Sequence, residues 1–421
     1  MNLQKKAAEF EKYVLDHFID NNGVIYSRLN KTTKKPWKKQ DWQDSYEFLK
    51  VPNRAPWDII NYENSGMTTG ALLAAMSYKY MVTQEENTLK TASLLLKGLN
   101  YIFEAGKTLE EGFFPKMYGG KYSSETSTDQ CLYAMKGMMA FREIADEKET
   151  ALINHMICKM VDFWVSRAYH YDYFGIKDML WPLGRFPALL LMAYTCSKDK
   201  KYLAEFTKLN QENDVYKFPA DSQLLQRKNT PDNFSEYEKI NGRNYLLTVV
   251  HECATMDIME LDECLERNDD YRNYWLKSMK QCWQEGKLSL ANDGYCYFRI
   301  LYNPKTHEVN IPHPGYTLPE APLGWDFLRW AGAIKMPRST MLARVGINVN
   351  KWLPEENSMQ EVIKILNSVS LDKLSDYIPN DTDQILPKHK FLSSMLCGDS
   401  AANWLWAYWQ GRQEGFISKT Q

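Results

Sequence analysis

Apolar and polar residues along most of the chain recur with the period of an α-helix. Residues 3–19 carry apolar side chains about one helical turn apart and predict an opening amphipathic helix. Later helical segments come in pairs joined by short polar turns, whereas longer loops rich in Gly and aromatic residues, such as 106–124 and 169–181, separate the pairs. The predicted pairs are 67–82 with 88–104, 129–144 with 150–168, 183–195 with 201–210, and 244–261 with 271–284; further helices are predicted at 324–334, 359–369 and 400–410.

The helical hairpins repeat about every 55–60 residues, which is typical of a repeat architecture. Consecutive hairpins with alternating long and short connections can close into a ring that buries the inner helices and collects the long loops at one mouth. We therefore predict an all-α fold, an α/α toroid with long loops. The pattern over 294–309 (GYCYFRILYNPKTHEV) predicts a small β-hairpin that turns at 303–306. No linker or composition shift divides the chain, so residues 1–421 are expected to form one domain.

The charge balance excludes some partners. With 51 Lys and Arg against 53 Asp and Glu, the formal net charge is −2, which lacks the positive field of a nucleic-acid-binding protein. No apolar run approaches the ~18 residues needed to cross a bilayer, so we expect no membrane partner. The charged start MNLQKKAAEF lacks the apolar region of a signal peptide and predicts a cytoplasmic protein, or a periplasmic one if a leader precedes it. The 8 cysteines form no CxxC pair and are expected to be free, mostly buried thiols.

The familiar cofactor and metal motifs are absent from the sequence. It contains no GxGxxG, GxxxxGK[ST], HExxH or GxSxG, and no paired-Cys metal signature. We therefore expect neither a cofactor nor a bound metal. Aromatic residues, in contrast, are abundant, with 26 Tyr, 17 Phe and 13 Trp. Such rings fill the spaces between helices, and some of them can line a cleft where they stack on sugars.

Three short motifs resemble those of six-hairpin glycosidase-like proteins. Residues 63–72 (ENSGMTTGAL), followed by 80–83 (YMVT), are similar to a recurrent hairpin of that superfamily. Residues 180–182 (LWP), followed by 193–195 (AYT) and 201–203 (KYL), look like a later hairpin of it. Residues 127–130 (STDQ) are similar to the Ser-x-Asp-Gln that opens an inner helix in many bacterial toroid proteins acting on polysaccharides. The resemblance covers roughly residues 55–210 and implies an all-α (α/α)6 toroid, a six-hairpin barrel, with carbohydrate activity.

The resemblance leaves the reaction open. The superfamily includes unsaturated glucuronyl and rhamnogalacturonyl hydrolases, other glycosidases, polysaccharide lyases and N-acylglucosamine epimerases. The Trp-Trp-Pro-His segment expected of the epimerases is here Leu-Trp-Pro-Leu at 180–183, without its His. The Asp-Asp pair expected of the uronyl hydrolases is here Thr128-Asp129.

Glycoside hydrolysis needs two carboxylates, so acids where long loops meet helix starts are the candidates. Asp129 is the first of them. If Ser127 is the N-cap, Gln130 completes a capping box and Asp129 lies in the first turn, where the helix dipole favours its ionised form. Such a carboxylate suits a base or nucleophile, although a first-turn acid can also do no more than satisfy the dipole.

Two further acids are candidates for the second carboxylate. Glu63 lies among aromatic and aliphatic residues before a helix, where partial burial would keep it protonated as a general acid requires. It fits equally well a loop Glu bonded to the amides of the next helix start. Asp326 follows Trp325 in an aromatic loop and is either a cleft carboxylate or a first-turn helix acid.

Other residues are candidates for holding the sugar. Arg185 and Arg243 can meet an acidic sugar through bidentate contacts, or bond to loop carbonyls. His251 lies in an apolar run, where a core role is the alternative to a catalytic one. Asp58 is a weaker alternative acid. The residues expected to bind substrate are Trp57, Asp58, Tyr118, Gln130, Trp181, Arg185, Arg243, His251 and Trp325.

The sequence thus predicts a carbohydrate-active enzyme, a glycoside hydrolase that acts on an oligosaccharide through Asp129 and a second carboxylate, Glu63 or Asp326. A polysaccharide lyase or sugar epimerase is the alternative enzyme, with Tyr118, His251 and Arg243 at the reacting centre. A saccharide-binding toroid without catalysis is the third possibility, because one architecture hosts unrelated functions.

Overall fold

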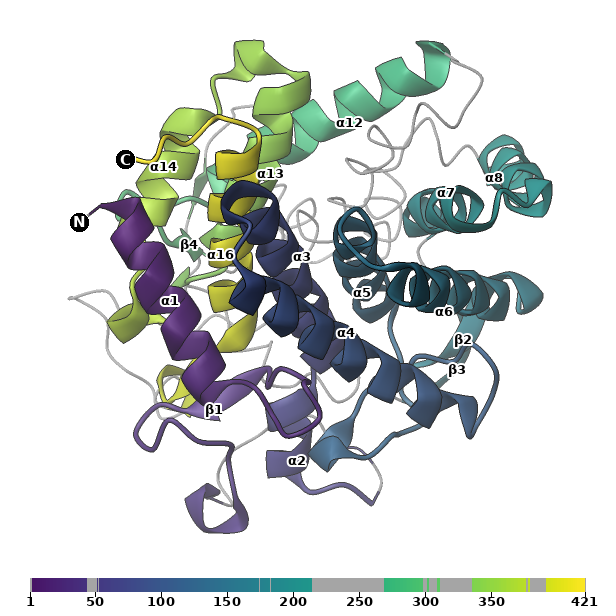
Figure 1. The fold of residues 1–421 in the computed structure, drawn as a ribbon, viewed down its shortest axis with the longest axis horizontal. Coiled ribbons are helices and arrows are strands. Elements are labelled where there is room, and N and C mark those ends of the chain that lie inside the picture. The colour runs from purple at the N-terminus through teal and green to yellow at the C-terminus, as the bar shows by residue number, and fades with distance from the viewer. Residues whose placement is uncertain are drawn as a thin grey trace.

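Helices dominate the computed structural model of the chain, as the periodicity predicts (Figure 1). The structure describes residues 2–43, 51, 53–173, 175–181, 183–213, 269–297, 301–302, 309–310, 335–375, 378 and 391–420. Its α-helices are α1 (Leu3–His17), α2 (Pro56–Tyr62), α3 (Ser65–Thr83), α4 (Glu86–Lys107), α5 (Thr128–Arg142), α6 (Glu147–Ser166), α7 (Phe186–Ser197), α8 (Lys200–Asn213), α12 (Asp269–Leu288), α13 (Ser339–Trp352), α14 (Met359–Ser368) and α16 (Gly398–Gln413). The predicted helices at 244–261 and 324–334 lie outside the described residues.

Two kinds of helix build the fold. The helices α3, α5, α7, α13 and α16 are buried on nearly every side; on α16, for example, every residue from Gly398 to Gly411 is buried. The helices α1, α4, α6 and α14 bury one face, as their amphipathic sequences require. The first group therefore forms an inner row and the second an outer layer around it.

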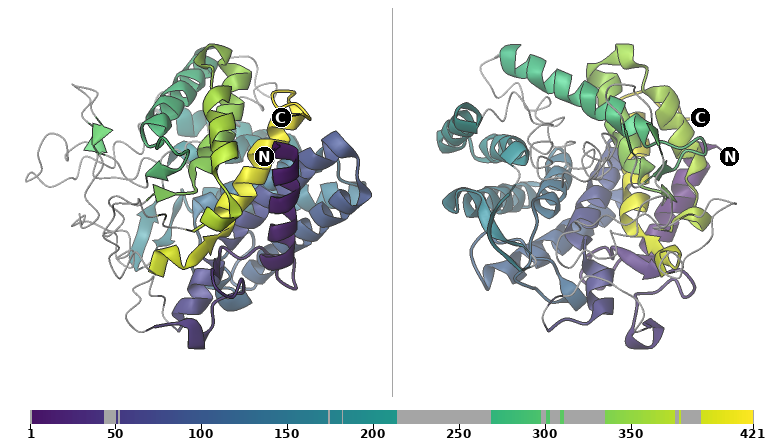
Figure 2. Two further views of the ribbon diagram at one scale, coloured as in Figure 1. Left: turned by 90° about the vertical axis from the view of Figure 1, so that its left-hand side faces the viewer. Right: turned by 180° about the vertical axis from the view of Figure 1, so that it is seen from behind.

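The inner helices follow one another as neighbours in the order α7, α5, α3, α16, α13. Outer helices cover them: α4 packs on α3, α6 on α5 and α7, α8 on α7, and α12 and α14 on α13. The first helix, α1, packs against the last, α16, so the two ends of the chain meet (Figures 1 and 2). There the Asn2 side chain donates a hydrogen bond to the Thr420 carbonyl at 3.1 Å. This arrangement confirms the predicted α/α toroid.

The contact between α3 and α5 depends on glycines. A Cβ placed on Gly137 would lie 2.2 Å from the carbonyl oxygen of Gly70, and one placed on Gly70 would lie 2.2 Å from that of Tyr133. The two inner backbones therefore touch, and neither position has room for a methyl group.

Replacing Gly137 with Ala is expected to lower the free energy of unfolding by about 1–3 kcal/mol, because the methyl group must push two packed inner helices apart. This is the net loss, after the ~1 kcal/mol by which Ala stabilises a helix interior relative to Gly. Urea unfolding measures the difference, with Glu104→Ala on the exposed face of α4 as the control, expected within ~0.5 kcal/mol of the wild type. A Gly137→Ala protein as stable as the wild type would show that the inner helices do not meet here.

Short antiparallel pairs of strands accompany the helices. They are β1 (Arg28–Asn30) with β8 (Met395–Cys397), β2 (His170–Tyr173) with β3 (Ile176–Leu180), β4 (Cys296–Tyr297) with β7 (Lys335–Met336), and β5 (Leu301–Tyr302) with β6 (Val309–Asn310). The hairpin predicted at 294–309 is present as β5 and β6, but its first part, β4, pairs with β7 instead. The stretch 169–181, expected to be a loop, is the hairpin β2–β3. On β2, the ring of Tyr171 packs beside Phe163 and Trp164.

The connections place the mouth of the toroid. The short turns 83–86, 142–147 and 197–200 follow α3, α5 and α7 and join each to its outer partner. The long connections 107–128 and 166–186 lead back into α5 and α7, so they lie at the N-terminal ends of these inner helices. No helix among the described residues is long and apolar enough to cross a membrane.

Candidate active site at the mouth of the toroid

Buried charged side chains gather at the N-terminal ends of the inner helices. Glu63 precedes α3, Arg185 precedes α7, Arg338 precedes α13 and Asp399 begins α16. Few charged side chains are ever this deeply buried without partners, because removing a charge from water is costly. The buried charged residues near this end include Arg28, Glu63, Lys116, Arg185, Arg338 and Asp399.

Glu63 is the centre of a buried ion-pair network. Its carboxylate accepts a hydrogen bond from Lys116 Nζ at 2.7 Å and lies 3.6 Å from Arg28 Nη1. The side chain of Glu63 is 3 % exposed and that of Lys116 is 2 % exposed. These are the contacts of a charged carboxylate held by two cations, and they differ from the neutral, half-buried acid that the sequence suggested.

The start of α5 is held differently from the predicted capping box. Ser127 is the N-cap, but its side chain makes no capping hydrogen bond. Gln130 turns instead toward α3: its amide oxygen accepts from the Met67 backbone N–H at 3.2 Å, and its amide nitrogen donates to the Glu63 carbonyl at 3.2 Å. The predicted capping box is therefore wrong, because Gln130 joins two inner helices. Asp129 does lie in the first turn of α5, where it is half-buried.

Arg185 also joins two inner helices. Its guanidinium, buried before α7, donates a hydrogen bond to the hydroxyl of Thr128 at the start of α5. The bond runs between the residues that open these two helices, and it holds their N-terminal ends together. This contact fits a structural role for Arg185, which was the alternative to substrate binding.

The aromatic candidates lie in the core. Trp181 is 3 % exposed, and its ring centroid lies 5.5 Å from that of Trp164 and 5.1 Å from that of Tyr173. Tyr118 is 0 % exposed, and burial raises its pKa well above the usual range, with the Glu63 and Glu125 carboxylates adding to the effect. Both rings are therefore packed rather than presented to a sugar.

The helix α2 carries the next two candidates. Trp57 is half-buried and packs against a small cluster that includes Ile59 and Ile60. Asp58 is half-buried as well, and burial raises its pKa while the nearby charges of Arg54 and Lys121 oppose the rise. The remaining candidates, Arg243, His251, Trp325 and Asp326, lie outside the described residues.

Asp399 is a buried acid that sequence reasoning missed. It accepts a hydrogen bond from Asn64 Nδ2 at 3.0 Å, and its second oxygen meets the Thr68 hydroxyl. The Thr68 hydroxyl donates to Asp399 and also lies 3.0 Å from the Asn64 carbonyl oxygen. Burial raises the pKa of Asp399, although the charges of Arg338 and Arg28 and the hydrogen bonds from Thr68 and Asn64 oppose the rise.

The raised pKa of Asp399 predicts a pH-dependent stability. Because the folded pKa exceeds the unfolded one, this group's stabilisation is present at pH values below about 4 and is lost as pH rises through the folded pKa, with a slope of up to about 1.4 kcal/mol per pH unit. Asp399→Asn mimics the neutral acid and lacks this dependence. We therefore expect the wild type to lose stability relative to the variant as pH rises from 4 to 8 in urea unfolding. A difference that stays constant over this range would contradict the protonated state.

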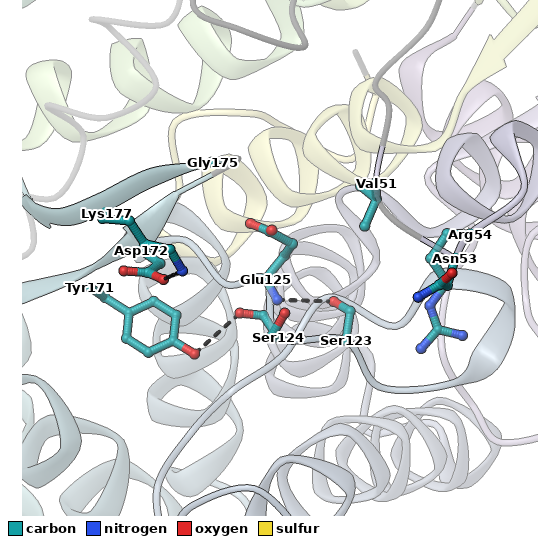
Figure 3. A pocket seen from close by; sticks show the side chains of 10 residues that line it. All are labelled: Val51, Asn53, Arg54, Ser123, Ser124, Glu125, Tyr171, Asp172, Gly175 and Lys177. Atoms are coloured by element: carbon teal, nitrogen blue, oxygen red, sulfur yellow. Dashed lines mark hydrogen bonds and ion pairs between the residues drawn. The ribbon is translucent and has the colours of Figure 1, made fainter.

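A cavity of about 730 Å³ opens at the same end (Figure 3). Three of the long connections line it: the segment before α2, the segment before α5 and the hairpin β2–β3. Its lining residues are Val51, Asn53, Arg54, Ser123, Ser124, Glu125, Tyr171, Asp172, Gly175 and Lys177. We call it the mouth cavity.

Carboxylates of the mouth cavity were not among the sequence candidates. Glu125 comes four residues before Asp129 on the loop that enters α5. Asp172 lies on β2 and forms an ion pair with Lys177 of β3, which holds the pKa of Asp172 below its usual range. Neither acid stands at a predicted helix start, since Glu125 precedes the N-cap of α5 and Asp172 lies in the stretch predicted to be a loop. Among the residues that the structure describes, no cluster of three or more His, Cys, Asp or Glu side chains is arranged to hold a metal ion.

Comparisons with known proteins identify the fold. No protein-family model matches the chain, and no curated protein matches it in sequence. Among solved structures, a glycosyl hydrolase family 88 protein from Bacteroides vulgatus aligns with a TM-score of 0.53 at 10% identity, over 98% of this chain and 99% of that one. A cellobiose 2-epimerase from Bacillus thermoamylovorans aligns with a TM-score of 0.52 at 10% identity, over 96% and 99% of the two chains. A D-mannose isomerase aligns with a TM-score of 0.51 at 10% identity, over 99% and 97%. The described part of the chain thus has the fold of the six-hairpin glycosidase-like toroid proteins.

Proposed function

We propose that the protein is a carbohydrate-active enzyme that acts on an oligosaccharide bound at the mouth of the toroid. The observation that carries the proposal is the position of Asp129. This half-buried carboxylate stands in the first turn of an inner helix, at the end where the long connections build a cavity large enough for a small-molecule ligand. The toroids that align with the chain bear the names of a glycosyl hydrolase, an epimerase and a sugar isomerase, which supports sugar chemistry in general.

Hydrolysis is the reaction that we propose. Asp129 serves as nucleophile or base, since the N-terminus of α5 stabilises its negative charge. The second carboxylate must be able to carry a proton. Asp58, with a pKa raised by partial burial, meets that requirement, whereas the ion pairs of Glu63 with Lys116 and Arg28 support a structural role for it. Asp326 remains the other proposed partner of Asp129.

A product analysis tests this proposal against its rivals. The wild type is incubated with cellobiose, an α-linked mannobiose, D-mannose and an unsaturated uronyl disaccharide. New reducing ends are measured chemically, and the sugars are identified by NMR. Hydrolysis splits any disaccharide that is a substrate into two sugars. An unchanged number of reducing ends with a new epimer or ketose would replace the hydrolase by an epimerase or isomerase, and a panel left entirely unchanged would favour a binding protein.

A further inference from the structure

The mouth cavity has the features of a subsite for an uncharged sugar. Resting on the proposed function, we propose that it binds a neutral glycosyl unit of the oligosaccharide, next to the unit that reacts at Asp129. A uronate unit, with its carboxylate, is the alternative that the lining disfavours. The size of the cavity, its charge balance, the hydrogen bonds in its walls and its connection to α5 favour the neutral unit.

The size of the mouth cavity suits a small saccharide. Its volume of about 730 Å³ falls within the ~300–1,000 Å³ that is usual for small-molecule sites. In Figure 3, the hairpin residues Tyr171, Asp172 and Lys177 lie on one side, and Asn53 and Arg54 lie on the other. Ser123, Ser124 and Glu125 lie between them.

The charges that line the mouth cavity balance. Its described cations are Arg54 and Lys177, and its described carboxylates are Glu125 and Asp172. Lys177 and Asp172 form an ion pair with each other, and the charge of Arg54 also acts on Asp58. A uronate would thus enter a site whose cations already face carboxylates, and it would meet the Glu125 carboxylate as well. Hydroxyl groups, which both donate and accept, suit this mixture of amide, hydroxyl, carboxylate and guanidinium groups.

The walls of the mouth cavity are held by hydrogen bonds. The Tyr171 hydroxyl donates to the Ser124 carbonyl at 3.2 Å and ties the hairpin to the loop before α5. In that loop, the Glu125 N–H donates to Ser123 Oγ at 3.2 Å, and Ser123 Oγ donates to the Lys116 carbonyl at 2.8 Å. The ring of Tyr171 is backed by Phe113 and Phe163, with centroids 5.4 and 5.5 Å away. A lining that is already ordered loses little entropy when a ligand binds.

The loop connects the mouth cavity to the reacting carboxylate. Asp129 follows Glu125 by four positions, and a fully extended chain would cover at most about 14 Å over that length. One sugar in the mouth cavity and the next one near Asp129 are therefore within the reach of a short oligosaccharide. The subsite would favour chains of two or more units over a monosaccharide.

Binding measurements on a variant without the proposed catalytic carboxylate test the subsite in the absence of turnover. In the Asp129→Asn background, neutral gluco-, manno-, galacto- and xylo-oligosaccharides of two to four units are titrated by NMR and calorimetry, beside oligogalacturonates. We expect at least one neutral series to bind more tightly than the uronates. Ser124→Trp, which places an indole in the mouth cavity from an exposed position, should weaken that binding at least tenfold. Glu125→Gln, which keeps the shape of the side chain, should weaken it several-fold.

The controls separate the subsite from the catalytic proposal. Asn87→Trp adds the same indole at an exposed site at the short-turn end of α4 and should leave binding unchanged. Thermal unfolding of each variant verifies the fold. Tighter uronate binding, binding that is insensitive to Ser124→Trp, or no neutral binding at all overturns the subsite. If the wild type turns over no sugar but a neutral oligosaccharide binds and Ser124→Trp abolishes that binding, the subsite is supported and the proposed enzymatic function is rejected.

Discussion

Replacing Lys116 with Met should lower the free energy of unfolding by about 3–5 kcal/mol, the usual cost of removing one partner of a buried ion pair. Lys116 and Glu63 are both almost completely buried, and their charged atoms are 2.7 Å apart. Without the ammonium group, the Glu63 carboxylate keeps Arg28 at 3.6 Å as a more distant partner. Equilibrium unfolding in urea measures the loss, with Lys12→Met on the exposed face of α1 as the matched control, since Lys12 pairs with Asp16 at the surface.

The double variant Lys116→Met/Glu63→Gln sharpens this prediction. Because it removes both charges, it should recover most of the stability that the single change loses. A double variant as unstable as the sum of the two single variants would contradict the pairing. A Lys116→Met protein that unfolds like the wild type would show that Glu63 is neutral, as the sequence suggested for a general acid.

Replacing Asp129 with Asn is expected to lower kcat by about 10²–10⁴-fold on whichever sugar the product analysis identifies, the range that one acid or base commonly contributes. Asn keeps the size of the side chain but is neither a base nor a nucleophile. Because Asp129 is half-buried in a first turn, the stability should change by less than about 1 kcal/mol. Steady-state kinetics and urea unfolding give the two numbers.

The matched control for this variant is Asp146→Asn. Asp146 begins the outer helix α6, where its side chain accepts a hydrogen bond from the Glu149 N–H at 2.8 Å, and Asn can cap the helix in the same way. It lies at the short-turn end, so activity should be unchanged. An Asp129→Asn enzyme with wild-type kcat would remove Asp129 from the mechanism.

The helices and their order were predictable because the spacing of apolar residues along the sequence reflects which side of each helix is buried. The stretch 67–82 is apolar around the whole helix and becomes the inner helix α3, whereas 3–19 is amphipathic and becomes the outer helix α1. The β2–β3 hairpin was missed because its aromatic residues mimic those of a packed loop. On β3 every residue but Met179 is exposed, and the β2 residues are all half-buried, so neither strand shows an alternation of buried and exposed positions.

The site was less predictable because its contacts join residues far apart in the chain. The capping box at 127–130 fits the local pattern, yet Gln130 bonds to residues 63 and 67 across the α3–α5 contact. Likewise, a Glu in an aromatic stretch suggests a neutral acid until Lys116, 53 positions away, is found beside it. The position of Asp129 in the first turn of α5 was predictable from the local sequence, because it depends only on where the helix begins.

We propose that a sugar binds at the N-terminal ends of the inner helices, between Asp129 and the mouth cavity. The decisive measurement is a crystal structure of the Asp129→Asn protein soaked with the neutral oligosaccharides of the binding panel. We expect sugar density that spans residue 129 and the lining residues Ser124 and Glu125. Density at the short-turn end of the helices, or along the outer layer, would contradict it.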